Sequence, residues 1–122
     1  MNQSDNAVSI NPYFKVSNEK LQAFKRLAED LIEVTRGEMG CLFYGFSYAD
    51  DEAYCREGYK DADSLVSHLD NVSDLLQKLE SISELARLEV HGRQDEIAKL
   101  REWPSIKKLN PKYYLLEGGF RN

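Results

Sequence analysis

The sequence predicts a single α+β domain of the ferredoxin-like split type, an antiparallel βαββαβ sheet with helices on one face. Three observations favour this fold. The predicted elements follow the order strand, long helix, strand, strand, helix, strand. A chain of 122 residues suits one hydrophobic core. Residues 41–60 read as two adjacent strands joined by an acidic turn. We expect this core at about 8–92, followed by a C-terminal helix-strand extension at 93–122.

Composition and charge narrow the possible classes of partner. The chain has 21 acidic and 16 basic residues and a net charge of −5, which argues against nucleic acid and anionic membrane surfaces. No apolar run approaches the ~18–20 residues of a membrane span. The first six residues have neither the basic start nor the apolar segment of a signal peptide. We therefore expect a cytoplasmic protein without a nucleic-acid or membrane partner.

The first predicted strand, residues 8–16, is half polar, because apolar residues on one side alternate with more polar residues on the other. Asn11 and Tyr13 lie on the more polar side, while the even-numbered residues form the apolar side. Pro12 cannot donate a hydrogen bond to a neighbouring strand, so it suggests an edge-like or bulged segment.

Apolar residues spaced by three and four predict a helix that ends at about Arg36, with Gly37 as its stop. Asp61 or Asp63 is expected to cap a second helix with a leucine-rich stripe, and His68 lies at the margin of its buried face. The pair Asp70-Asn71 is poor helix interior, so we expect a kink or a break there that splits one helix into two. The remaining predicted elements are a strand at 85–91, a helix at 95–103, one turn at 106–109 and a strand at 112–117.

The predicted strand at 41–48 is apolar on both faces. The chain's own helices can cover one face, and a domain of this size has little left to cover the other. A second copy of the chain is the natural cover, so we expect a homodimer.

The two cysteines are predicted to be free thiols. If Ala49 pairs with Glu52 across the turn, Cys55 lies opposite Phe46 and Cys41 lies opposite Lys60. The sulfur atoms are then about 17 Å apart along the sheet, beyond disulfide reach.

The runs TRGEMGCLFY (35–44) and REGYKDADSLVSHLDN (56–71) resemble the antibiotic biosynthesis monooxygenase domain. The matching pattern is a Glu-x-Gly-Cys that opens the second strand, a Glu-x-aromatic on the third and a histidine in the next helix. The resemblance implies a dimeric α/β barrel. It also implies two possible activities, namely oxidation of aromatic or quinol substrates by molecular oxygen without metal or bound cofactor, and haem degradation.

The resemblance points to candidate site residues. His68 and Glu57 are the predicted catalytic pair, because a base in an apolar pocket can deprotonate an electron-rich substrate that then reacts with oxygen. We expect no cofactor and no metal ligands. The predicted substrate-binding residues for a small aromatic molecule are Asn11, Tyr13, Tyr44, Phe46, Tyr59, Asn71 and His91.

Each assignment has a structural alternative. His68 could be a packed core residue, Glu57 a partner in an ion pair, and His91 a turn or interface residue. The aromatic residues could be core or interface. A second hypothesis is therefore a non-catalytic homodimeric small-molecule-binding or stress-responsive protein of the same fold.

Other chemistries have less support in the sequence. The histidines and cysteines lack the short spacing of zinc ligands, and no Gly-x-Ser-x-Gly elbow occurs. Haem degradation is a distant third hypothesis. Tyr59 stands where that branch has tryptophan, and the only tryptophan is Trp103 in the extension.

Overall fold

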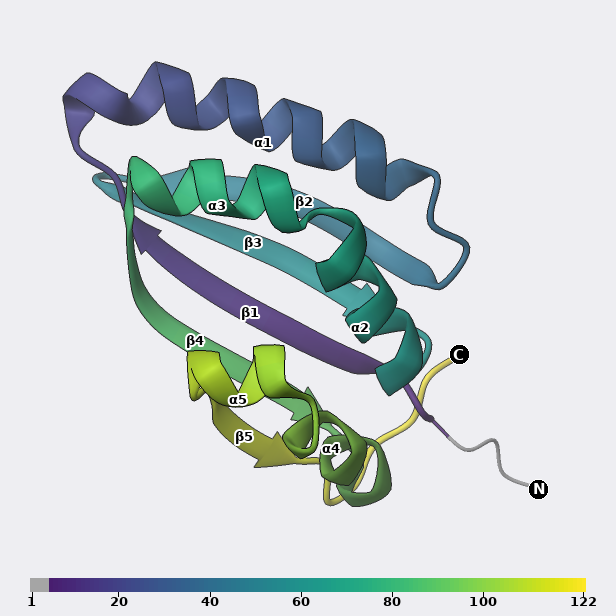
Figure 1. Ribbon diagram of the computed structural model, residues 1–122. Helices are drawn as coiled ribbons and strands as arrows, with labels where there is room; N and C mark the ends of the chain where they lie inside the picture. Colours follow the sequence, from purple (N-terminus) through teal and green to yellow (C-terminus); the bar gives the residue numbers. More distant parts are fainter. Residues whose placement is uncertain (1–4) are drawn as a thin grey trace.

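The computed structural model describes residues 5–122 and shows a mixed α+β fold (Figure 1). Met1–Ser4, part of the segment in which no signal peptide is expected, lie outside the described residues. The elements are β1 (Val8–Lys15), the 3₁₀ turn η1 (Asn18–Lys20), α1 (Leu21–Arg36), β2 (Cys41–Ala49), β3 (Glu52–Tyr59), α2 (Ala62–Asn71), α3 (Ser73–Ser81), β4 (Glu84–Gly92), α4 (Gln94–Arg101), α5 (Pro104–Leu109) and β5 (Lys112–Leu115).

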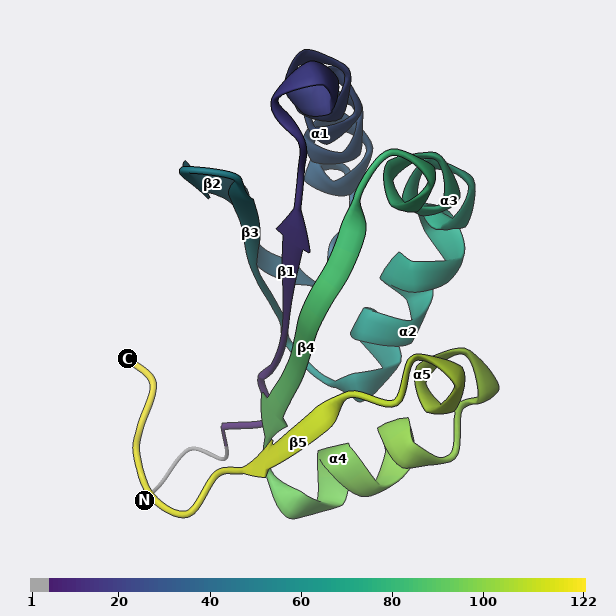
Figure 2. The same ribbon diagram turned by 90° about the vertical axis from the view of Figure 1, so that its left-hand side faces the viewer.

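The sheet has the order β2-β3-β1-β4-β5. Its first four strands are antiparallel, as predicted for the ferredoxin-like split fold, and β5 adds to the edge parallel to β4. All five α-helices lie on one side of the sheet (Figure 2). Within residues 5–122 no helix covers the opposite side, which we call the open face.

Local sequence explains where helix α2 begins and where it ends. The Asp61 side chain accepts a hydrogen bond from the Ser64 backbone N–H at 2.9 Å and so caps α2. The predicted break after Asp70-Asn71 is confirmed, since α2 ends at Asn71 and α3 begins at Ser73.

Pro12 does not lie in an edge strand, which was one of the two alternatives that the sequence suggested. β1 is the central strand, between β3 and β4. The backbone pairing with β3 skips Asn11 and Pro12, and a register shift against β4 follows between Tyr13 and Phe14. The interrupted pairing accommodates the missing N–H, so only the bulged alternative was right.

The predicted pairing of Cys41 was wrong by one residue. Ala49 pairs with Glu52 and Phe46 with Cys55, as expected, but a bulge between Cys41 and Phe43 puts Cys41 opposite Tyr59 instead of Lys60. The bulge turns Cys41 toward the helices, where it packs against the core. Both cysteines are free thiols.

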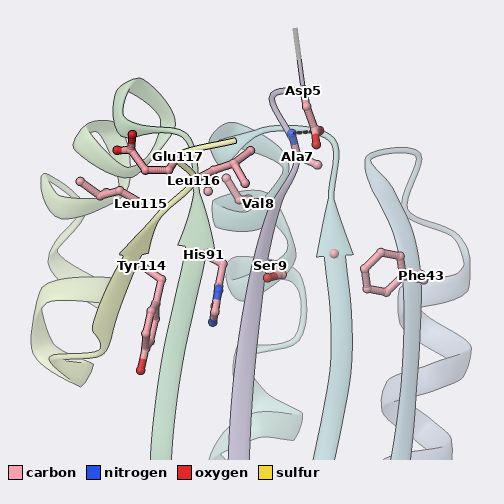
Figure 3. Close-up of a pocket in the computed structure, with 12 residues that line it drawn as sticks. Asp5, Ala7, Val8, Ser9, Phe43, His91, Tyr114, Leu115, Leu116 and Glu117 are labelled. Carbon is pink, nitrogen blue, oxygen red and sulfur yellow. Dashed lines mark hydrogen bonds between the residues drawn. The ribbon is translucent and has the colours of Figure 1, made fainter. Parts of the chain in front are cut away.

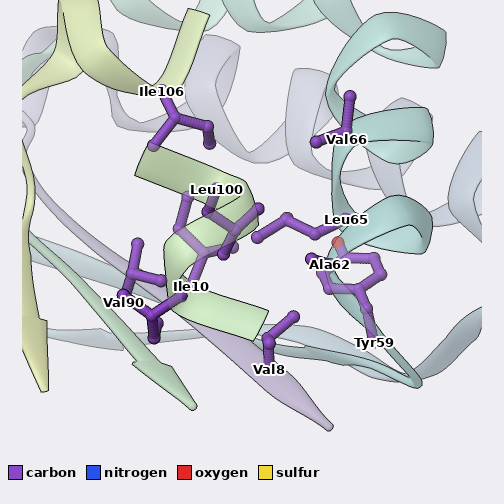
Figure 4. Close-up of a cluster of buried hydrophobic side chains, with 10 residues drawn as sticks. Val8, Ile10, Tyr59, Ala62, Leu65, Val66, Val90, Leu100 and Ile106 are labelled. Carbon is purple, nitrogen blue, oxygen red and sulfur yellow. The ribbon is translucent and has the colours of Figure 1, made fainter. Parts of the chain in front are cut away.

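Two clusters of buried side chains fill the space between sheet and helices. One cluster joins β1, β3 and β4 to α2, α4 and α5 (Figure 4). The other lies beneath α1 and α3 and includes Phe24, Leu31 and Leu79. Ile106 and Leu100 of the extension are fully buried in the first cluster, so the extension is part of the core. Among the described residues, no helix is both long and apolar enough to cross a membrane.

Candidate active site

Glu57 lies in the middle of β3 with its carboxyl group under the helices. It is paired with Ile10 of β1 and Tyr44 of β2, and only 5% of it is exposed. Burial raises the pKa of Glu57 to about 7, and hydrogen bonds from Tyr59 and Cys55 act against that rise. At neutral pH the carboxyl is therefore divided between its protonated and ionised forms, which suits it to give or take a proton.

His68 reaches the same place from α2. It is one turn after the core residue Leu65, so it points inward, and it is 2% exposed. Its Nδ1 lies 2.9 and 3.0 Å from the two carboxylate oxygens of Glu38, and its Nε2 lies 3.5 Å from Glu57 Oε1. Burial lowers the pKa of His68, although Glu38 opposes this, so the imidazole is neutral at pH 7. We call Glu38, His68, Glu57 and Tyr59 the proton-transfer cluster.

Tyrosine side chains enclose the imidazole. The ring centroids of Tyr44 and Tyr59 lie 5.4 and 5.0 Å from that of His68, and Phe46 packs on Tyr44 at 5.8 Å. The Tyr59 hydroxyl donates a hydrogen bond to Glu57 Oε1 at 2.5 Å. Burial raises the pKa of both tyrosine hydroxyls, so they stay protonated and act as hydrogen-bond donors. Three predicted substrate-binding residues, Tyr44, Phe46 and Tyr59, thus lie on the helix side of the sheet together with His68 and Glu57.

Two cavities adjoin the proton-transfer cluster. A mostly apolar cavity of about 40 Å³ is lined by Glu57, His68 and side chains of β1, β4, α2 and α3, and the exposed residues Glu80 and Leu109 mark its mouth. A second cavity, of about 270 Å³, lies between the end of α1 and β2 and is lined by Glu38, Thr35 and Tyr44 among others. The cluster therefore has an apolar approach and a more polar one.

The other predicted substrate-binding residues do not join this site. Asn11 and Tyr13 alternate with the inward-facing residues of β1, so they lie on the open face. There Asn11 accepts a hydrogen bond from the Tyr54 hydroxyl at 2.7 Å, and Tyr13 stacks on Tyr54 at 4.7 Å. Asn71 stays near the cluster, but its side-chain amide donates to Glu38 Oε2 at 2.9 Å, not into either cavity.

His91 also lies on the open face. Its ring stacks on that of Tyr114 with centroids 4.5 Å apart, and its Nε2 lies 3.2 Å from Glu89. Figure 3 shows these two rings near Ser9, with Phe43 farther away across the sheet, around a hollow of about 320 Å³. The sheet backbone separates this hollow from the proton-transfer cluster, so the predicted site residues divide into two groups.

Glu38 is the site residue that the sequence reasoning missed. It belongs to the Glu-x-Gly-Cys pattern, but that pattern was used only to recognise the family. The sequence did offer a signal, since the carboxylate of Glu38 and the histidine His68 belong to the same family pattern. The distance between them depends on how α2 packs against the loop before β2, which the sequence pattern does not reveal. No group of three or more His, Cys, Asp or Glu within residues 5–122 is arranged to hold a metal ion.

Comparison with solved structures places the chain among proteins of this fold. A putative antibiotic biosynthesis monooxygenase from Caulobacter crescentus CB15 matches with a TM-score of 0.64 and 20% identity, over 70% of this chain and 88% of that one. Another from Nitrosomonas europaea matches with a TM-score of 0.66 and 14% identity, over 77% and 96%. These similarities define the fold class as that of the antibiotic biosynthesis monooxygenase-like proteins.

A more similar structure is MupZ from Pseudomonas fluorescens. It matches with a TM-score of 0.92 and 34% identity over 100% of this chain and 94% of MupZ, so the match includes the extension. The chain therefore belongs to one family with MupZ, an antibiotic biosynthesis monooxygenase-like family by its fold. No family model and no curated protein matches the sequence.

Proposed function

We propose that the protein is a cofactor-independent monooxygenase acting on a quinol or polyphenol-like aromatic molecule. The observation that carries this proposal is the buried, neutral imidazole of His68, whose Nε2 faces the Glu57 carboxyl at 3.5 Å beside an apolar cavity. A neutral base beside a carboxyl group, both kept from bulk water, suits proton abstraction from a weakly acidic carbon or hydroxyl.

The chemistry divides between substrate and protein. A deprotonated quinol or anthrone-type anion is electron-rich enough to reduce molecular oxygen itself. When a ring CH₂ becomes C=O, one oxygen atom enters the substrate and the other leaves as water with the two hydrogens. The protein needs only to remove the first proton at His68 Nε2 and to stabilise the anion. Protonated Glu57, which lines the same cavity as His68, is the donor for the second task.

Binding an aromatic ring requires the apolar cavity to widen. Its volume of about 40 Å³ admits water or oxygen, whereas sites for drug-sized ligands measure roughly 300 Å³ or more. Leu109, the last residue of α5, is 37% exposed at the mouth, so movement of its side chain can open the cavity. The names of the Caulobacter and Nitrosomonas neighbours support a monooxygenase, and the aromatic substrate remains our proposal.

We further propose a cytoplasmic homodimer formed through the open face. Phe43 of β2, which lines the open-face hollow, is 38% exposed in the single chain, and the same face carries stacked aromatic pairs. Light scattering should give twice the 14.1 kDa of the chain. Phe43→Asp, which puts a carboxylate beside Arg56, should yield monomers, whereas the control Val34→Asp on α1, where the valine is 41% exposed, should not. Wild-type particles of single-chain mass would overturn the dimer.

Oxygen consumption with a panel of quinols and anthrones tests the catalytic proposal. His68→Gln and Glu57→Gln should each lower the rate about 10²-fold or more, the usual contribution of a positioned acid or base. His91→Gln is the matched control, because His91 lies on the open face away from the cluster. No oxygen uptake with any substrate, or equal rates in all three variants and the wild type, would reject the assignment.

A non-catalytic binding protein is the second candidate. It is favoured by the extent to which the polar groups of the cluster bond to one another, as in a buried network that only stabilises the fold. A ligand that raises the melting temperature without oxygen uptake or chemical change would support it. Haem degradation has little structural support, because Trp103 is 41% exposed in the extension and Tyr59 is bonded to Glu57. Titration with haemin should leave the Soret band unchanged.

A further inference from the structure

We infer that Glu38 is a positioning residue that holds His68 as the tautomer with hydrogen on Nδ1, leaving Nε2 as the free base. The catalytic consequence rests on the proposed function, whereas the tautomer itself does not. Glu38 does not need to touch substrate in this role. It acts through the imidazole, by deciding which ring nitrogen faces the apolar cavity with a lone pair.

The contacts of Nδ1 determine the tautomer. Both carboxylate oxygens of Glu38 lie within hydrogen-bond distance of Nδ1, at 2.9 and 3.0 Å. Asn71, one turn after His68 on α2, donates to Glu38 Oε2 and so holds the carboxylate from the same helix. An ionised carboxylate only accepts hydrogen bonds, so Nδ1 must be the donor. A neutral imidazole has one N–H, and therefore Nε2 carries none.

The contacts of Nε2 leave it available. Its nearest carboxyl oxygen, Glu57 Oε1, is 3.5 Å away, longer than an ordinary hydrogen bond. That oxygen already accepts the Tyr59 hydroxyl at 2.5 Å. Both Glu57 and His68 line the apolar cavity, so a substrate there meets an unprotonated nitrogen. Glu38, with 15% of its side chain exposed, lines the second cavity, which gives a proton taken up at His68 a route away from the substrate.

The loop between α1 and β2 explains why Glu38 can reach His68. The Glu38 backbone N–H donates to Thr35 at the end of α1, and Gly40 accepts from the Lys60 backbone N–H, both at 2.9 Å. Gly40 lies so close to α2 that a Cβ there would be 2.3 Å from Ser64 Oγ. Glycine therefore lets the loop approach α2 closely enough for the carboxylate to meet Nδ1. The spacing Glu-x-Gly has a physical reason in this chain.

The tautomer can be measured directly without a substrate. The chain has 2 histidines, so long-range ¹H–¹⁵N spectra of imidazole-labelled protein contain two ring systems, and His68→Gln assigns them. At pH 7.5 the wild type should show hydrogen on His68 Nδ1 and none on Nε2. His91 serves as the internal control. A wild-type spectrum with hydrogen on Nε2, or with the two tautomers equally populated, would overturn the inference whether or not any variant folds.

Variants test the causes. Glu38→Ala should shift the Nδ1–H to Nε2–H ratio by about tenfold or more, because a hydrogen bond to a charged group is lost and Glu57 becomes the nearest acceptor. Gly40→Ala should produce the same shift while Glu38 remains in the chain. Its control is Gly45→Ala, since a Cβ at Gly45 meets nothing within 4 Å. A ratio unchanged in Glu38→Ala, or changed equally in both glycine variants, would count against the inference.

The inference and the proposed function can fail separately. The predicted tautomer together with no oxygen uptake would leave Glu38 as a positioning residue and reject the monooxygenase. Oxygen uptake by a protein that carries hydrogen on His68 Nε2 would support the monooxygenase and reject Glu38 as the residue that sets the tautomer. Where both hold, Glu38→Ala should lower kcat with little change in KM, and Glu38→Asp should restore part of the rate together with the Nδ1–H tautomer.

Discussion

Replacing Glu57 by glutamine should change how the stability of the protein depends on pH. The folded carboxyl holds its proton up to a pKa of about 7, whereas in the unfolded chain it releases the proton near its ordinary value of 4.5. Between those values the folded state binds more protons than the unfolded state, so the free energy of unfolding falls as pH rises. The shift corresponds to about 3 kcal/mol, lost mainly between pH 4.5 and 7.

Glutamine cannot ionise, so the variant lacks this loss. The difference in unfolding free energy between Glu57→Gln and wild type should therefore rise by about 3 kcal/mol between pH 4.5 and 8. Urea unfolding at fixed protein concentration, followed by circular dichroism, measures it at each pH.

Glu52→Gln provides the matched control, since Glu52 begins the same strand and is exposed. It should follow the wild-type pH profile. The reasoning is refuted if the difference between Glu57→Gln and wild type is flat from pH 4.5 to 8. A difference that falls with pH would refute it too, because that would mean a carboxylate stabilised by the fold.

Three further outcomes are expected. Burial raises the pKa of Cys41 to about 11 and that of Cys55 as well, so iodoacetamide at pH 8 should modify both slowly in the native protein and rapidly in urea, as followed by mass spectrometry. Asp61→Ala should cost about 1 kcal/mol of unfolding free energy, because the hydrogen bond to the Ser64 N–H is lost, and Asp61→Asn should restore most of it. Leu79→Ala, at a fully buried position, should cost roughly 2–5 kcal/mol in urea unfolding, and an effect below about 1 kcal/mol would contradict its place in the core.

Much of the fold could be predicted because its signals are local. The alternation of 8–15, the three-and-four spacing of α1 and the turn at Asp50-Asp51 each depend on neighbours within a few residues. The errors arose where the pairing of neighbouring strands determines the place or the register of a residue. Pro12 reads as an edge residue until β3 and β4 are seen on both sides of β1. Cys41 reads as a partner of Lys60 until the bulge shifts the register.

The candidate site was predictable in part for the same reason. Strand parity places Glu57 and Tyr59 on one side, and the helical stripe points His68 inward, so their meeting follows from the fold. The same parity separates Asn11 from Glu57, since Asn11 follows Ile10, the residue that pairs with Glu57. Pooling these residues in one binding site ignored a distinction that the sequence already contained.

The sequence by itself determined the element order, the shared side of Glu57 and Tyr59 on one strand, the place of His68 beside a buried stripe, and the interruption at Asp70-Asn71. Hydrophobic periodicity and capping act over a few residues, so these features are local. Only the tertiary structure decided that Glu38 meets Nδ1 of His68, 30 residues away along the chain, and that β1 is central. The contact depends on how closely the loop at Gly40 packs on α2. Packing of this kind is set by the whole core, and no local pattern encodes it.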